Sequence, residues 1–148
     1  MDVPILRSTT SVTARAFRFR AGGRLRRRTD YLAVQERGRR YPGQHYLLLA
    51  RRRGEPLRRG ASGFSRETAR SEAVVGDIAR LGITVSRKVG NAVERNRVKR
   101  WVRESYRHLQ ALAPRSMDLV VIARPQAVTS GLAATSRELE ALLRKLPR

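Results

Sequence analysis

The chain has 148 residues and no cysteine. Its formal net charge is +21, because it contains 33 lysines and arginines and only 12 acidic residues. The lack of cysteine excludes a disulfide framework, thiolate zinc ligands and a thiol nucleophile, and no apolar run approaches the length of a transmembrane helix. So much positive charge repels itself unless a polyanion neutralises it, which makes nucleic acid the leading candidate for a partner.

Residues 1–20 are predicted to form a flexible basic tail. This segment is rich in Ser, Thr and Arg, as organellar transit peptides are, but Asp2 and Pro4 fit an amphipathic presequence poorly. Residues 21–148 are expected to form a single domain, since 41% hydrophobic residues are enough for a modest core. Within that domain, residues 54–77 are polar and aperiodic, which predicts a surface-loop insertion.

The predicted elements of the domain begin with a short helix and two strands. In "RLRRRTDYLAVQERG", Thr29 is a candidate N-cap, Asp30 suits the first turn and Gly38 is a suitable stop. The segment "GQHYLLLARRR" predicts a strand centred on residues 46–50. After the insertion, "RLGITVS" alternates between apolar and polar residues, so this second strand has one polar face.

The next element is a long amphipathic helix. Asn91 and Glu94 have capping-box spacing and Ala113-Pro114 is a suitable stop, which predicts a helix over about 92–112. At about 100° per residue, one side of this helix gathers a stripe that is expected to face the core. The stripe consists of Glu94, Val98, Trp101, Val102, Ser105, Tyr106 and Leu109.

The opposite side of this helix is basic, and we call it the cationic strip. It consists of Asn96, Lys99, Arg100, Arg103 and Arg107, with Arg95 and Arg97 on its two flanks. A solvated helix face normally mixes acids with bases, and this strip contains no acid. The pattern therefore favours contact with a polyanion over simple solvation. The preceding turn carries Arg87, Lys88 and Gly90 at a helix N-terminus, where free backbone N–H groups attract phosphate.

A buried strand at 118–123 and a helix at about 131–146 complete the predicted elements. The order helix, strand, strand, helix, strand, helix indicates an α+β fold in which two helices pack on one face of a small sheet. No catalytic cluster is visible. His45 and His108 are isolated, and Glu94 and Glu104 point about 80° apart on the helix. The sequence indicates a binder of polyanions without machinery for covalent chemistry.

The segment "RLGITVSRKVGNAVERNRVKRWVRESYR" resembles the signature of the bacterial ribonuclease P protein family. The resemblance extends to residues 24–53 and 78–146. It implies a small mixed four-stranded sheet in the order αβββαβα, with a left-handed crossover between the parallel strands. It also implies a cytoplasmic protein that is the non-catalytic subunit of an endoribonuclease, whose partners are the catalytic RNA and precursor tRNA. The RNA removes the 5′ leader with Mg²⁺ that is held mainly by the RNA and the substrate. No obligate protein partner and no membrane are implied.

The resemblance also implies two sets of contact residues. The residues expected to dock on the catalytic RNA are Arg95, Asn96, Arg97, Lys99, Arg100 and Arg103. The residues expected to bind the leader are Tyr31, Tyr46, Arg80, Thr84, Ser86, Arg87, Lys88 and Asn91. Gln35 and Leu49 stand where the family often has aromatic residues, so stacking on leader bases is expected to be weaker or displaced.

Three questions stay open at the level of sequence. Tyr31 is either a platform on which leader bases stack or a core aromatic residue. The chain could instead be a ribosomal or chaperone-like structural RNA-binding protein with no role in cleavage. The chain could also be a cationic protein that binds the membrane surface, which would require an apolar helix face open to lipid.

Overall fold

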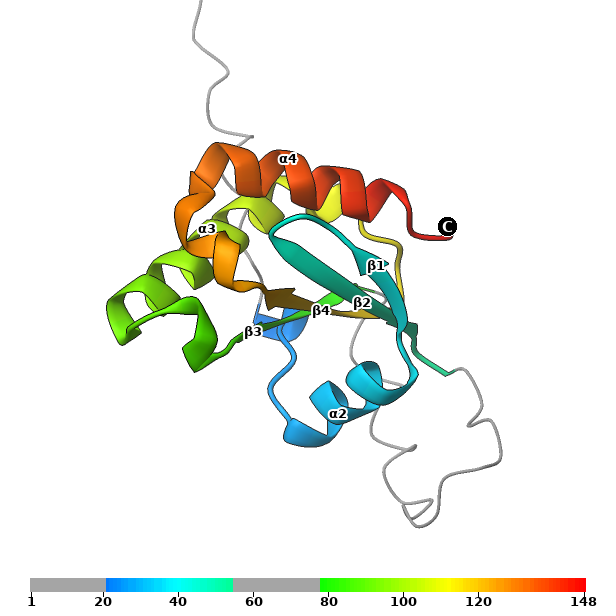
Figure 1. Cartoon of the computed structure of the whole chain (residues 1–148). Coiled ribbons are helices and arrows are strands. Elements are labelled where there is room, and N and C mark those ends of the chain that lie inside the picture. The colour runs from blue at the N-terminus through cyan, green and yellow to red at the C-terminus, as the bar shows by residue number, and fades with distance from the viewer. Residues whose placement is uncertain (1–20, 55–77) are drawn as a thin grey trace, which may run out of the picture.

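The computed structural model describes residues 21–54 and 78–148, and Figure 1 shows its elements. The helices are α2 (Arg28–Arg37), α3 (Ala92–Leu109) and α4 (Gly131–Arg144), and the strands are β1 (Arg39–Pro42), β2 (Tyr46–Arg52), β3 (Arg80–Val85) and β4 (Met117–Ala123). Short 3-10 turns are η1 (Ala21–Gly23), η3 (Arg87–Val89), η4 (Gln110–Leu112) and η5 (Pro125–Thr129). The order αβββαβα is confirmed. The predicted tail and all of the predicted insertion except Gly54 lie outside the described residues.

The four strands form one mixed sheet in the order β1-β2-β4-β3. β1 pairs with β2 and β2 with β4 in antiparallel fashion, whereas β3 and β4 are parallel neighbours. The chain therefore crosses from β3 to β4 through α3. Because β3 and β4 run in the same direction, with Val85 beside Ala123, the residues that follow both strands lie at the same end of the sheet.

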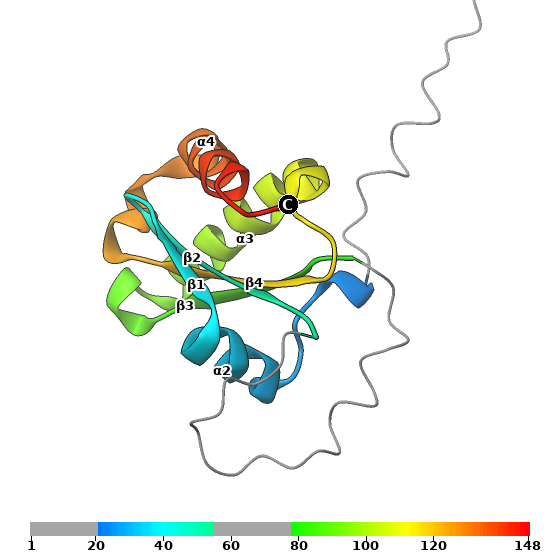
Figure 2. The ribbon, with the colours of Figure 1, turned by 90° about the vertical axis from the view of Figure 1, so that its right-hand side faces the viewer.

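Helices lie on both faces of the sheet, as Figure 2 shows. The predicted pair on one face is α3 and α4, and α2 adds a helix on the other face, which the residue pattern did not predict. Tyr46, Leu48, Leu119 and Val121 belong to the larger core, under α3 and α4. The smaller core, on the α2 side, consists of Leu25, Val34, Leu49 and Val120.

The two predicted helix starts had different outcomes. At α3 the Asn91 side chain accepts a hydrogen bond from the Glu94 N–H at 2.9 Å, and the Glu94 carboxylate accepts one from the Asn91 N–H at 2.8 Å, so the capping box is confirmed. The Thr29 cap was wrong. α2 begins at Arg28, Arg27 occupies the N-cap position, and no side chain caps this end.

The predicted stripe of α3 faces the core except for Glu94, which caps the start of the helix. Val98, Val102, Ser105 and Tyr106 are buried, and Trp101 packs half-buried at the edge of the core. Burial raises the pKa of the Tyr106 phenol above its ordinary range. With this stripe enclosed, α3 has no apolar face open to lipid, which argues against the membrane-surface interpretation. None of the helices in the described part of the chain is long and apolar enough to cross a membrane.

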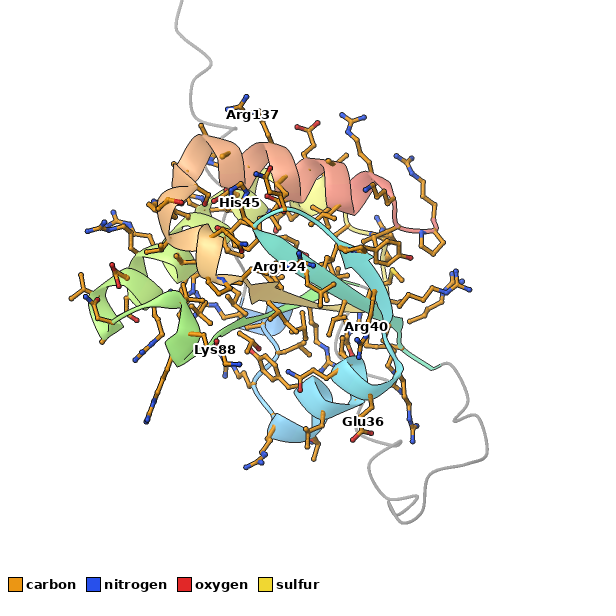
Figure 3. All side chains as sticks on the ribbon, viewed as in Figure 1. Glu36, Arg40, His45, Lys88, Arg124 and Arg137 are labelled. Carbon is orange, nitrogen blue, oxygen red and sulfur yellow. The ribbon has the colours of Figure 1, made fainter. Side chains whose placement is uncertain are left out.

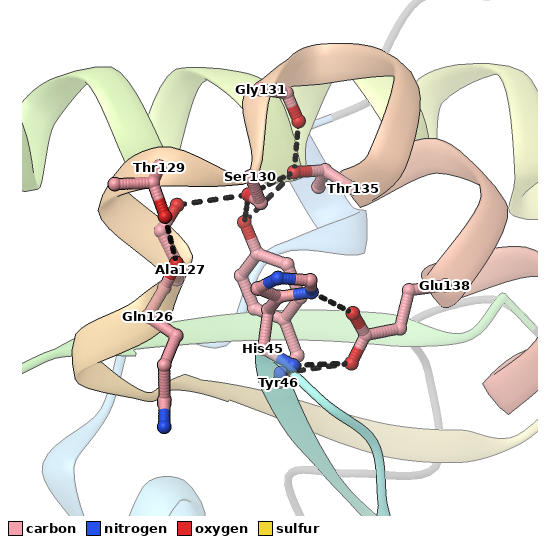
Figure 4. A network of polar contacts seen from close by, with 9 residues as sticks. All are labelled: His45, Tyr46, Gln126, Ala127, Thr129, Ser130, Gly131, Thr135 and Glu138. Carbon is pink, nitrogen blue, oxygen red and sulfur yellow. Dashed lines mark hydrogen bonds and ion pairs between the residues drawn. The ribbon is translucent and has the colours of Figure 1, made fainter.

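A polar network holds the turn between β1 and β2 against α4 (Figure 4). The Glu138 carboxylate accepts hydrogen bonds from the backbone N–H groups of His45 and Tyr46, at 2.8 and 3.0 Å, and lies 2.7 Å from His45 Nδ1. The Tyr46 hydroxyl lies 2.8 Å from Thr135 Oγ1. His45 is therefore a structural residue, as its isolated position in the sequence indicated.

The residues that flank positions 55–77 are held together at the opposite end of the sheet. Arg53 donates a hydrogen bond from its guanidinium to the Ile78 carbonyl, and its backbone N–H donates to the Ser116 carbonyl at 2.8 Å. Its Nε also lies 3.9 Å from the carboxylate of Asp118, which is 2% exposed. Residues that precede and follow the segment thus share one polar cluster.

Candidate nucleic-acid interface

The cationic strip lies on the outer side of α3, opposite the buried stripe. Within the described residues, Arg97, Lys99, Arg100 and Arg103 make no ion pair or side-chain hydrogen bond, and all but Lys99 are exposed. Arg95 donates a hydrogen bond to the Gly90 carbonyl at 3.0 Å. The four cations are therefore available to a polyanion without the loss of an existing contact.

Arg107, the last cation of the strip, is paired with an acidic side chain. The guanidinium of Arg107 donates a hydrogen bond to Glu104 at 2.7 Å, and His108 Nε2 lies 3.3 Å from the same carboxylate. Both pairs are on the surface, where an ion pair contributes little to stability but does offset charge locally. The part of the strip without neutralising acids thus ends near Arg103.

The turn between β3 and α3 presents Ser86, Arg87 and Lys88 as exposed residues. The capping box already occupies the N–H groups of Asn91 and Glu94, and the Glu94 carboxylate lies where an anion would bind the helix N-terminus. Phosphate contact through these backbone groups is therefore disfavoured. A phosphate at this turn would be bound by the side chains of Arg87 and Lys88.

Tyr31 lies on the α2 side of the sheet, directly over β3. A Cβ atom placed on Gly82 would lie only 2.6 Å from Tyr31 Cε1, so this ring position requires a glycine beneath it. The Tyr31 hydroxyl accepts a hydrogen bond from the Ile83 N–H at 3.3 Å, and the residue is half-buried. Tyr31 therefore combines a structural contact with partial exposure, and both of its predicted roles keep some support.

A row of residues crosses the sheet on the same face. The strand register aligns Thr84 on β3 with Ile122 on β4, Leu47 on β2 and Pro42 on β1. The first three are half-buried and Pro42 is exposed. We call this set the outer row. It begins two residues before Ser86, so it continues the surface of the turn across the sheet.

Of the other residues predicted to bind the leader, Tyr46 does not lie on this surface, and Arg80 lies on the α2 side of β3 with its side chain already bonded. Tyr46 is 0% exposed and faces α4, because it stands on the opposite side of β2 from Leu47. Arg80 donates hydrogen bonds to both carboxylate oxygens of Asp118 at 2.7 Å and to Asp30 at 3.3 Å. The Tyr46 assignment was wrong, because Tyr46 is a core residue. Arg80 ties α2 to β3 and β4, and we assign it this structural role in place of leader contact.

Arg124 also lies beside the turn, and it was not among the residues predicted to contact RNA. It follows Ala123, the partner of Val85, and its backbone N–H donates a hydrogen bond to the His45 carbonyl at 2.9 Å. Figure 3 shows Arg124 and Lys88 among the side chains on the ribbon. The parallel pairing of β3 and β4 is the signal that could have found Arg124, and residue patterning alone does not show that pairing.

Comparisons with known proteins agree on one family. The Ribonuclease P family model matches residues 19–147. The ribonuclease P protein component of Desulfovibrio desulfuricans is 39% identical over 127 residues, which cover 84% of this chain and 83% of that protein. The component from Thermotoga maritima is 35% identical over 101 residues, which are 68% of each protein.

Solved structures give the same result. The RNase P protein from Thermotoga maritima matches with a TM-score of 0.64 and 29% identity, and the match covers 84% of this chain and 98% of that one. The Staphylococcus aureus RNase P protein matches with a TM-score of 0.62 and 26% identity, over 82% and 92% of the two chains. This chain belongs to the ribonuclease P protein family.

Proposed function

We propose that this chain binds the catalytic RNA of ribonuclease P and the 5′ leader of precursor tRNA, and so supports removal of the leader by the RNA. The proposal rests on a row of cations on α3 that have no partner among residues 21–54 and 78–148, in a chain of this family. These cations are Arg97, Lys99, Arg100 and Arg103. Such a surface binds a phosphate backbone by releasing counterions. We assign Arg95 and Asn96, which adjoin these cations, to the same docking surface.

The leader is assigned to the surface that joins the turn to the α2 side of the sheet. Ser86, Arg87 and Lys88 are exposed there, and Tyr31 and Thr84 adjoin them half-buried. Cations that follow a backbone beside an aromatic ring bind single-stranded RNA with little dependence on its sequence. That property suits a protein whose substrates carry many different leaders.

The chemistry is assigned to the RNA. Within residues 21–54 and 78–148, no three acidic or histidine side chains gather to hold a metal ion. The proposal therefore places Mg²⁺ on the catalytic RNA and the substrate, where it would direct water at the phosphodiester. The protein contributes binding of the substrate and lowers the magnesium concentration that cleavage requires. Membership of this family argues against a purely structural ribosomal or chaperone-like role.

The test is cleavage of precursor tRNA by the cognate catalytic RNA, with and without the protein, over a series of magnesium concentrations. Addition of the protein should lower the magnesium midpoint and raise the affinity for precursor relative to mature tRNA. The variant with Arg97, Arg100 and Arg103 changed to Ala should have neither effect at protein concentrations that saturate the native complex. Identical magnesium midpoints and affinities with and without the native protein would contradict the proposal.

A further inference from the structure

A second group of arginines lies at one corner of the sheet, at a distance from the turn. β1 begins with Arg39 and Arg40, and β2 ends with Arg51 and Arg52. Antiparallel pairing, with Arg39 opposite Ala50, brings these four residues together, and we call them the arginine corner. Arg39, Arg40 and Arg52 are exposed, and Arg51 is half-buried. Figure 3 shows Arg40 on β1, close to α2.

The charge of this corner is not offset within the described part of the chain. None of its four arginines makes an ion pair or side-chain hydrogen bond there, and the neighbouring Glu36 makes none with them. Asp118, which stands opposite Arg51 on β4, is already bonded to Arg80. Four like charges gathered at one corner repel one another, although no two of these arginines stand directly opposite in the register. A bound polyanion would remove that cost.

The arrangement of Arg39 and Arg40 suits a strand of nucleic acid at the sheet edge. β1 is an edge strand, and successive residues of a strand point to opposite faces. Arg40 shares the α2 side with the outer row, and Arg39 points to the other side. A phosphate backbone that leaves the sheet over β1 would therefore have one guanidinium on each side.

The outer row connects this edge with the turn. It runs from Thr84 on β3 to Pro42 on β1, and Arg40 is two residues from Pro42 along the strand. Three spacings between neighbouring strands amount to about 14 Å, so the edge is too far from the turn for the same nucleotide to contact both. A longer strand that crosses the outer row would reach it.

We propose that the arginine corner, chiefly Arg39 and Arg40, binds phosphates of the distal part of the precursor tRNA leader, beyond the nucleotides bound at the turn. This inference rests on the proposed function, because it extends the same leader track across the sheet. Arginines at an exposed edge reach phosphates rather than base edges, so the contact should be independent of leader sequence. It should depend on leader length.

The experiment uses the assembled complex of protein and cognate catalytic RNA, and a series of precursor tRNAs whose leaders grow by one nucleotide. The variant is Arg39→Gln/Arg40→Gln, and the control is Arg137→Gln/Lys145→Gln, which removes the same charge from the exposed surface of α4 and the residue that follows it. The native complex and the control should gain affinity at both early and late steps of the series. The Arg39/Arg40 variant should keep the early gain and lose the late one. For the longest leader, the ratio of native to variant affinity should grow about tenfold between roughly 200 and 50 mM salt, by loss of two phosphate contacts.

The outcomes separate this inference from the function on which it rests. If the native complex shows no dependence on the leader at all, the proposed function fails. If the native complex shows the dependence and the variant follows it at every length, only the arginine corner fails. The inference is also overturned if the variant loses affinity equally for mature tRNA, or if it fails to bind the catalytic RNA. Unchanged thermal unfolding of the variant excludes misfolding as the cause.

Discussion

The Tyr31 hydroxyl accepts a hydrogen bond from the backbone N–H of Ile83 at 3.3 Å, so a side chain of α2 satisfies a donor on the edge strand β3. Tyr31→Phe removes this contact and keeps the ring. We expect it to lower the free energy of unfolding by about 1 kcal/mol, because an N–H group loses its partner. The precursor-to-mature affinity ratio should stay near the native value. Thermal unfolding and the two tRNA affinities check both statements.

Tyr31→Ala completes that comparison. If the exposed part of the ring stacks on leader bases, this variant should also weaken precursor binding by roughly 1–3 kcal/mol and leave mature tRNA unaffected. A depressed unfolding midpoint together with a native affinity ratio would remove Tyr31 from the leader site. Gly82→Ala serves as a further control, since its Cβ would displace the ring without removing it.

A second prediction separates the two roles of Asn91, which is exposed and also caps α3. Asn91→Ala should cost about 1 kcal/mol of stability through loss of the cap, and Asn91→Ser should restore most of it. If the amide also contacts the leader, both variants should weaken precursor binding to the same extent. Restored precursor binding in the Ser variant alone would show that the cap is the only role of this residue.

The third prediction concerns Arg80, now assigned to the structure rather than to the leader. Among the described residues, Arg80→Ala leaves the buried Asp118 carboxylate paired with the more distant Arg53 alone, so we expect a loss of about 3 kcal/mol of stability. Lys88→Ala, at an exposed position, should leave stability unchanged and weaken binding of the precursor. Chemical denaturation beside tRNA affinities would refute the assignment if the two variants behaved in the opposite way.

The fourth prediction concerns salt. If about six phosphates contact the cationic strip, affinity for the catalytic RNA should fall on the order of a thousandfold between roughly 50 and 200 mM salt. The triple change of Arg97, Arg100 and Arg103 to Ala should reduce the slope of log K against log salt by about three. Arg137→Ala on α4 is the control and should keep the native slope. A native slope in the triple variant would move the docking surface away from α3.

Residue patterns predicted which segments form helices and strands better than they predicted which of these elements lie side by side. The stripe of α3 and the capping box follow from local periodicity and side-chain chemistry, and both are present. β1 has only four residues, three of them exposed, so it carries no alternation that a pattern could detect. It was expected only from the resemblance to a family.

The errors at the candidate site have a similar cause. Tyr46 and Arg80 were assigned to the leader through the resemblance to the family. Which face of β2 is turned toward α4, and which carboxylate lies opposite Arg80, depend on the pairing of strands that are far apart in sequence. Arg124 was missed for the same reason. Local sequence therefore predicted the strip on α3 and failed where the site is assembled from three strands.

The cluster at Arg53, Ile78 and Asp118 also affects how this family can vary. Arg53, which precedes residues 55–77, and Ile78, which follows them, are held next to each other by this cluster. The positions at which the connection leaves and re-enters the domain therefore stay the same whatever its length. The entropy of closing such a connection grows only with the logarithm of its length, by about 0.6 kcal/mol for each doubling. Evolution can therefore lengthen, shorten or replace this stretch at small thermodynamic cost, while the surfaces of α3 and β3 that we assign to RNA keep their geometry.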